Sequence, residues 1–190
     1  MPYTQWKIEE AKFFLEEMKF DGECDDAEKR VLDMIAGMIA DDAESRKHYS
    51  KTIESFCYHL SAFFCAFRSI TWIMQKEFEP IEGFSKWYLD IQDNLRKDGE
   101  MRLLKTARDF TLHEYIIPTC PEASVKTSQE NLICDISWYI TEDIKKDEEM
   151  AKIPNIDDII KKDVVTICTD CIDKMEKIVL DCEQKFYVGK

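Results

Sequence analysis

The scarcity of glycine and proline is the feature that most restricts the fold of this chain. Five glycines and five prolines occur among its 190 residues. Because these two residues interrupt helices and form most tight turns, the chain is expected to contain long helices and few turns. The segment from about residue 48 to 78 is apolar nearly all round, which is typical of a helix at the centre of a bundle or of a dimer interface. We therefore expect a single all-α domain that spans residues 1–190.

Apolar residues at helical spacing predict the other elements of the bundle. An acidic helical hairpin is expected over residues 1–47, with its helices at about 5–19 and 25–46. A core over residues 48–150 would follow, with helices at 48–78, 84–97 and 100–114, and then a long C-terminal helix within residues 155–190 that starts at Asp157 or Asp158. Pro118 and Pro121 predict an irregular stretch up to about residue 127.

Residues 129–147 fit two patterns. The spacing of Leu132, Ile136, Ile140 and Ile144 is that of one face of a helix. The alternation that runs from Leu132 through Cys134 and Trp138 to Ile140 fits a strand with a period of two. Both patterns remain open, and the length of the segment favours a helix.

The chain is strongly acidic. It contains 26 basic and 39 acidic residues, which gives a net charge of −13. Because nucleic acid is bound largely through lysine and arginine, any contact with RNA requires a local basic patch. No secretory leader opens the sequence and no apolar run is long enough to span a membrane, so we expect a cytoplasmic protein that does not bind membranes. The one close cysteine pair, Cys168 and Cys171, lacks the further ligands of a zinc site, and we expect no metal or other cofactor.

A compact set of groups suited to phosphate chemistry lies near the end of the fifth expected helix. Arg108 could stabilise charge on a phosphate, and His113 could act as a general acid or base. Asp109, one turn before His113, could hold the imidazole in one tautomer. His113 could equally be a cation that caps the C-terminus of the helix. On a helical wheel Arg108 and His113 do not share a face, so the arginine must reach around, the helix must loosen, or a second subunit must complete the site.

Basic residues surround this motif and form a candidate phosphate-binding patch. Arg102 and Lys105 precede the motif on the same expected helix, and Arg96 and Lys97 precede that helix, although Asp98 and Glu100 interrupt the run. Arg68, in the long apolar helix, is either a second arginine that faces the phosphate or half of a buried ion pair. We expect Arg68, Arg102 and Lys105 to bind phosphate or nucleotide.

Residues 50–115 resemble the HEPN-like domain family in their motifs and in the order of their helices. The resemblance rests on the run YHLSAFFCAFRSI at residues 58–70, on residues 75–78 and 84–87, and on Arg108-Asp109 followed by His113-Glu114. It implies an up-and-down helical bundle, commonly a homodimer, with the motif in a cleft between subunits. It also implies that Arg108 and His113 act on RNA in members that are nucleases.

The spacing Arg108-x4-His113-x-Tyr115 is similar to that of toxins paired with a nucleotidyltransferase antitoxin, which adenylylates the tyrosine. The resemblance thus implies Tyr115 as a modification site and such an antitoxin as a partner. The expected function is action on RNA or binding of a nucleotide through Arg108 and His113, in one form as a metal-independent ribonuclease of the toxin–antitoxin or stress type. The alternative is a non-catalytic HEPN-like module that binds nucleotides or other proteins.

Overall fold

The computed structural model describes residues 3–22, 43–113, 117–127 and 132–187. These residues are mostly helical, as expected, and they also form a small antiparallel sheet of two strands. The elements in chain order are α1 (Tyr3–Gly22), α3 (Ala43–Phe78), α4 (Phe84–Lys97), α5 (Gly99–His113), β1 (Thr119–Thr127), β2 (Leu132–Ile140), the 3-10 helix η1 (Glu142–Lys146), α6 (Glu148–Ala151), α7 (Ile156–Ile159) and α8 (Val164–Phe186). Within these residues, no helix combines the length and the apolar character needed to cross a membrane.

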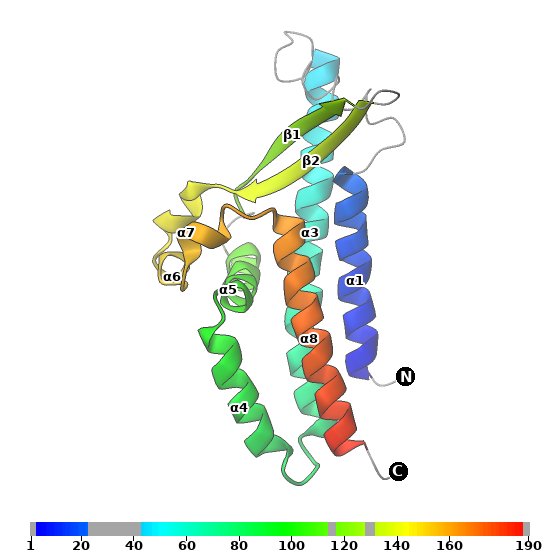
Figure 1. Ribbon diagram of the computed structural model, residues 1–190, viewed down its shortest axis with the longest axis vertical. Coiled ribbons are helices and arrows are strands. Elements are labelled where there is room, and N and C mark those ends of the chain that lie inside the picture. Colours follow the sequence, from blue (N-terminus) through cyan, green and yellow to red (C-terminus); the bar gives the residue numbers. More distant parts are fainter. Residues whose placement is uncertain (1–2, 23–42, 114–116, 128–131, 188–190) are drawn as a thin grey trace.

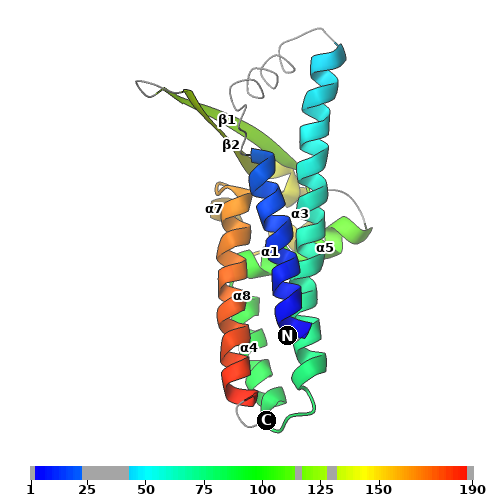
Figure 2. The same cartoon turned by 90° about the vertical axis from the view of Figure 1, so that its right-hand side faces the viewer.

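Helix α3 is the central element of the molecule, and α1 and α8 run alongside it (Figures 1 and 2). The spacing predicts an apolar stripe of Ile8, Ala11, Phe14 with Leu15, and Met18 on α1. This stripe is confirmed, because all of these residues are buried except Phe14, which is partly buried. Residues 23–42 lie outside the described part of the chain, so the predicted second helix of the acidic hairpin stays a prediction. Residues 43–46, which we assigned to that helix, belong to α3 instead.

The carboxylate of Glu77, near the end of α3, binds both the first and the last described helix. It accepts hydrogen bonds from the backbone N–H of Thr4 at 3.0 Å and from the Thr4 hydroxyl at 2.7 Å. The phenol of Tyr187, directly after α8, donates to the same carboxylate at 2.6 Å. Burial alone would raise the pKa of Glu77, but these hydrogen bonds outweigh it and lower the pKa, so Glu77 is an anion at neutral pH.

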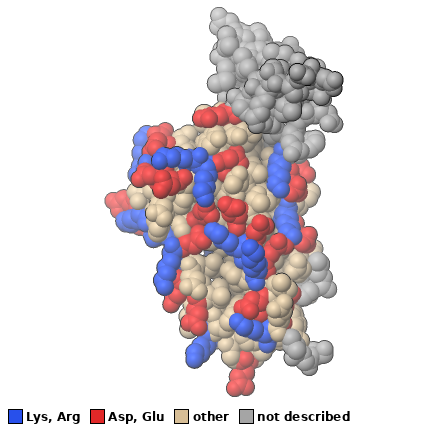
Figure 3. All heavy atoms as spheres, in the orientation of Figure 1, with Lys and Arg blue, Asp and Glu red and all other residues tan. Residues whose placement is uncertain are grey.

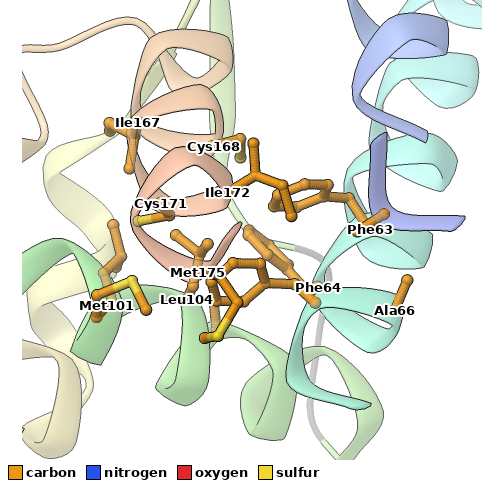
Figure 4. Close-up of a cluster of buried hydrophobic side chains, with 14 of the residues drawn as sticks. Phe63, Phe64, Ala66, Met101, Leu104, Ile167, Cys168, Cys171, Ile172 and Met175 are labelled. Carbon is orange, nitrogen blue, oxygen red and sulfur yellow. The ribbon is translucent and has the colours of Figure 1, made fainter. Parts of the chain in front are cut away.

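Side chains from α3, α5 and α8 meet in the hydrophobic core (Figure 4). Phe63 and Phe64 of α3 lie opposite α8, and Leu104 of α5 lies below them. Cys168 and Cys171 of α8 point into this cluster, and burial raises the pKa of both thiols. The two cysteines are therefore packed as protonated, apolar groups, which explains their close spacing without a metal or a disulfide.

The hairpin of β1 and β2 corrects two predictions. Residues 119–127 form a strand where we expected an irregular stretch, and residues 132–140 form its partner where length favoured a helix. The pairing runs from Thr119 opposite Ile140 to Thr127 opposite Leu132. The period-two pattern was therefore the correct one, because alternation in β2 places Trp138 and Ile140 on the buried side. Two prolines near the start of β1 are tolerated because both strands of a two-stranded sheet are edge strands.

The C-terminal helix begins later than predicted. Asp157 and Asp158 lie in the short helix α7, and α8 starts at Val164. The side chain of Asp163 forms the N-cap of α8 by accepting a hydrogen bond from the backbone N–H of Thr166 at 3.0 Å. Because Asp157, Asp158 and Asp163 all precede apolar residues, the capping signal occurs more than once in the sequence, and the structure uses the later one.

Candidate functional site

A pocket of about 400 Å³ lies between α3, α4 and α5, and α8 contributes one side chain. In Figure 1, α4 lies below α5 and beside α8. Side chains from α3, α4, α5 and α8 line the pocket. The lining residues are Phe67, Arg68, Thr71, Tyr88, Gln92, Leu95, Arg96, Met101, Arg102, Lys105 and Met175. The wall is therefore part apolar and part polar, which is the usual composition of a pocket for a small ligand.

The charged side chains of the pocket are all basic. Arg68, Arg96, Arg102 and Lys105 line it, and no aspartate or glutamate does. This concentration of one sign is unusual in a chain with a net charge of −13. On the face of the molecule drawn in Figure 3, by contrast, acidic and basic side chains are interspersed. The pocket is thus a local positive site that would attract a small anion.

The spacing of residues on α4 and α5 directs their side chains into the pocket. Tyr88, Gln92 and Arg96 follow one another at intervals of four on α4, so they share one face of that helix. Arg102 and Lys105 are three residues apart on α5 and are also neighbours on the helix surface. Arg96 is also ion-paired with Asp93 at 3.0 Å, and both of these side chains are largely exposed. Arg102 and Lys105 form no ion pair with any residue that the structure describes.

Arg68 enters the pocket from α3. Its guanidinium donates a hydrogen bond to the hydroxyl of Thr71 at 2.7 Å, and Thr71 also lines the pocket. Among the residues placed in the structure, no carboxylate lies within ion-pair distance of Arg68, so the buried ion pair considered above is not found there. A guanidinium held by a neutral partner keeps its full charge available to a ligand.

The two acids that interrupt the basic run point away from the pocket toward α8. The amino group of Lys174 lies 2.8 Å from the carboxylate of Asp98 and 2.9 Å from that of Glu100. Lys162 forms a second ion pair with Glu100 at 2.5 Å. Burial alone would raise the pKa of both carboxyls, but the hydrogen bonds from these lysines outweigh it and lower the pKa. Both acids are therefore charged and paired outside the pocket, and they do not neutralise its cations.

The start of α5 is fixed by its N-cap and by a close approach of the backbone. Asp98 accepts a hydrogen bond from the backbone N–H of Met101 at 3.1 Å. At Gly99, a Cβ atom would lie 2.3 Å from the carbonyl oxygen of Pro154 and 2.8 Å from a side-chain carbon of Ile159. Glycine is required here because no other residue leaves room for the chain at Pro154. This contact sets the position of α5 and, with it, of Arg102 in the pocket.

The predicted catalytic residues lie beyond the pocket on α5. Arg108 forms an ion pair with its neighbour Asp109 at 2.9 Å, and neither residue lines the pocket. The backbone of His113 ends α5, but its side chain and all of Tyr115 lie outside the described residues. The predicted contact between Asp109 and His113 therefore stays a prediction. The structure brings together Arg68, Arg102 and Lys105, but it does not place Arg108 or Asp109 with them.

Six pocket residues were not singled out from the sequence: Thr71, Tyr88, Gln92, Leu95, Met101 and Met175. A signal existed for two of them, because Tyr88 and Gln92 lie one and two turns before Arg96 on the amphipathic α4. Thr71 and Met175 gave no such signal, since they reach the pocket through the packing of α3 and α8. Within the described residues, no group of three or more His, Cys, Asp or Glu side chains is placed to hold a metal ion.

The described part of the chain is thus mostly helical, with a cationic pocket beside its central helix. The family model of bacteriophage lambda protein ea47 matches residues 42–113 of the chain. The matched stretch covers α3, α4 and α5, and it contains every residue that lines the pocket except Met175. No curated protein and no solved structure matches the chain.

Proposed function

We propose that the protein binds a phosphorylated ligand of nucleotide size in the pocket between α3, α4 and α5. The observation that carries this proposal is the set of four basic and no acidic lining residues in a strongly acidic chain. Arginine is well suited to such a ligand because its planar fork of donors matches two oxygens of a phosphate. The proposal corresponds to the nucleotide-binding form of the function expected from the sequence.

The apolar lining supports a ligand that carries more than a phosphate. Phe67, Leu95, Met101 and Met175 give the pocket an apolar wall, and Tyr88 adds an aromatic ring. Flat, weakly polar groups such as nucleobases bury well against such a wall, while the charged end of a nucleotide would meet Arg102 and Lys105. The volume of about 400 Å³ lies within the range of pockets that hold small organic ligands.

Calorimetric titration of the purified protein with ATP, GTP, AMP and inorganic phosphate tests the proposal. At least one nucleotide should bind more tightly than inorganic phosphate, and its affinity should fall as salt is added. The double substitution of Arg102→Gln and Lys105→Gln should weaken binding by at least about tenfold, because each removes a charge-assisted hydrogen bond of about 1.5–3 kcal/mol. Lys86→Gln on the exposed side of α4 is the matched control and should have no effect. Absence of binding, or equal affinity in the double variant and the control, would reject the pocket as the site.

RNA cleavage through Arg108 and His113 is a second candidate function. One observation favours it: Arg102, Lys105 and Arg108 follow one another at intervals of three along α5. This row of cations would let a phosphate chain extend from the pocket toward the end of the helix. Such a site needs no metal, since His113 would move the proton and Arg108 would stabilise the phosphate.

A further inference from the structure

The outer face of α3 carries a row of apolar and small residues at heptad spacing. Tyr58 and Trp72 are large side chains that are 64% and 56% exposed. Between them, Ala62, Cys65 and Ser69 complete the alternating intervals of four and three that characterise a helix packed lengthwise against another helix. The hydroxyl of Ser69 donates to the backbone carbonyl of Cys65 at 2.8 Å, so it needs no partner on the surface. We refer to these five residues as the outer stripe of α3.

The stripe is nearly symmetrical about Cys65. Tyr58 and Trp72 lie seven residues before and after it. Glu54 and Lys76, both exposed, lie eleven residues before and after it at the two ends of the row. If a second, identical helix lies antiparallel across the stripe with Cys65 on the two-fold axis, each Tyr58 meets a Trp72. The same arrangement places each Glu54 opposite a Lys76. The surface of one copy is therefore complementary to the identical surface of the other, in its aromatic residues and in its charges.

The distribution of charge also favours a second copy as the occupant. From Ser55 to Lys76 the chain contains no acidic residue, although 39 of its 190 residues are acidic. Two molecules that each carry a charge of −13 repel one another over most of their surfaces. Between Ser55 and Lys76, two copies of α3 can approach along the outer stripe without bringing carboxylates of this stretch together. The small side chains at its centre allow the two helices to approach closely.

We propose that the outer stripe of α3 is the interface of a homodimer in which two copies of α3 pack antiparallel about Cys65. The contact extends from Glu54 to Lys76, which is about 33 Å of helix at 1.5 Å per residue. The homodimer expected from the apolar character of this helix thereby acquires a defined surface and orientation. Most of the apolar residues of α3, such as Phe63 and Phe67, are buried within one molecule, and the outer stripe is what remains for a partner.

Light scattering coupled to size-exclusion chromatography tests whether the outer stripe is the dimer interface. The wild type should have twice the 22.4 kDa mass of one chain. Trp72→Glu should give a monomer of unchanged circular dichroism, because it places a carboxylate against Tyr58 of the second copy at each end of the contact. Leu89→Glu on α4 is the matched control, since Leu89 is also a large exposed apolar residue but lies off the stripe, and it should remain dimeric. A monomeric wild type, or equal masses for the two variants, would overturn the proposal.

Exchanging the charges of Glu54 and Lys76 tests whether the two copies of α3 are antiparallel. Glu54→Lys and Lys76→Glu should each weaken the dimer by about tenfold, because each replaces two symmetry-related ion pairs by like charges. The double variant should recover the affinity of the wild type, since every pair is restored with reversed sign. A parallel dimer places each residue opposite its own copy and shows no such recovery. A double variant that dimerises no better than the single variants would therefore reject the antiparallel arrangement.

A bifunctional maleimide of short span provides a second readout, because it should join two copies of Cys65 across the axis. The cross-linked dimer should persist in Cys120→Ser, which removes an exposed thiol away from the outer stripe, and disappear in Cys65→Ser, which removes the half-buried thiol on the axis. Cross-linking that survives Cys65→Ser would place the axis elsewhere and count against the proposal.

Discussion

Asp163 binds the backbone of Trp138 and so joins the hairpin to the last helix. One oxygen of its carboxylate accepts a hydrogen bond from the Trp138 N–H at 2.7 Å, and the other accepts from the Thr166 N–H as the N-cap of α8. The Trp138 side chain is 1% exposed and stacks on Phe56 of α3, with 3.9 Å between ring centroids and an angle of 5° between the rings. Three elements that are distant in the sequence therefore depend on the position of one carboxylate.

Asp163→Ala should lower the free energy of unfolding by about 2–4 kcal/mol, because it removes a helix cap and leaves the Trp138 N–H without an acceptor. Asp163→Asn has one acceptor oxygen instead of two, so it should cost about half as much. Urea unfolding followed by circular dichroism measures both values. Asp158→Ala is the control, since this aspartate is exposed and forms a surface ion pair with Lys161, and it should change stability by less than about 0.5 kcal/mol. A loss for Asp163→Ala no larger than that for Asp158→Ala would contradict the double role.

The ion pairs between Asp98, Glu100 and Lys174 should make the protein sensitive to acid. The folded-state pKa of each carboxyl lies below its ordinary value of 3.8 for aspartate or 4.5 for glutamate. Their contribution to stability is therefore complete above these values and is lost as the pH falls through the lowered pKa. Glu100→Gln should cost about 1–2 kcal/mol at pH 7, and the difference from the wild type should shrink below about pH 4. Thermal unfolding between pH 3.5 and 7 gives the comparison.

Glu82→Gln is the matched control for this pH dependence, because Glu82 is exposed in the turn before α4 and forms no ion pair with any described residue. It should leave both the stability at pH 7 and its dependence on pH unchanged. A difference between Glu100→Gln and wild type that stays constant down to pH 3.5 would mean that the lysine pairs are not its source.

Gly99→Ala should destabilise the protein by about 1–3 kcal/mol, because the added methyl group overlaps the carbonyl of Pro154. The same substitution should weaken ligand binding in the pocket, since it displaces the start of α5. Ile159→Ala removes a side chain that the new methyl group would contact but leaves the carbonyl in place. Most of the penalty for Gly99→Ala should therefore persist in an Ile159→Ala background. If it vanishes there, the side chain and not the backbone approach is what requires glycine.

Cleavage of single-stranded RNA should persist in the presence of EDTA if Arg108 and His113 form a metal-independent site. His113→Ala should then reduce the rate by about 10²–10⁴-fold, the usual cost of losing a positioned general acid or base. Arg108→Ala should reduce both binding and cleavage, whereas Lys86→Ala should reduce neither. A wild-type protein that leaves RNA intact under these conditions would leave nucleotide binding as the function of the pocket.

The helices could be predicted where one apolar period was consistent over a long segment. The starts and ends of α4 and α5 agree with the prediction within about one residue, since a glycine or a turn flanks each helix. The hairpin could not be predicted in the same way. Leu132, Ile136 and Ile140 satisfy both periods, and β1 contains polar residues and Pro121, which carry no strand signal of their own. Its strand character comes from pairing with β2, which is a tertiary effect.

The pocket was predictable in its basic residues but not in its charge balance. The run of basic residues around Arg102 and the lone arginine in the apolar helix identified three of the four cations that line it as phosphate-binding residues, and the fourth, Arg96, as part of the basic patch. In the sequence, however, Asp98 and Glu100 lie among these residues and would weaken the patch. Only the fold brings Lys174 to both carboxylates from 76 and 74 residues away. The positive character of the pocket thus depends on an interaction that no local pattern contains.

The Glu77 carboxylate has a consequence for the connectivity of the chain. Because Thr4 and Tyr187 bind the same side chain, both ends of the described chain lie at one end of the molecule (Figure 1). Helices α1 and α8 are therefore both fastened to the same end of α3, and a short linker could join Thr4 to Tyr187. A circularly permuted protein with its ends joined there could retain every contact of the pocket. The helices should thus form the same fold when they are synthesised in a different order.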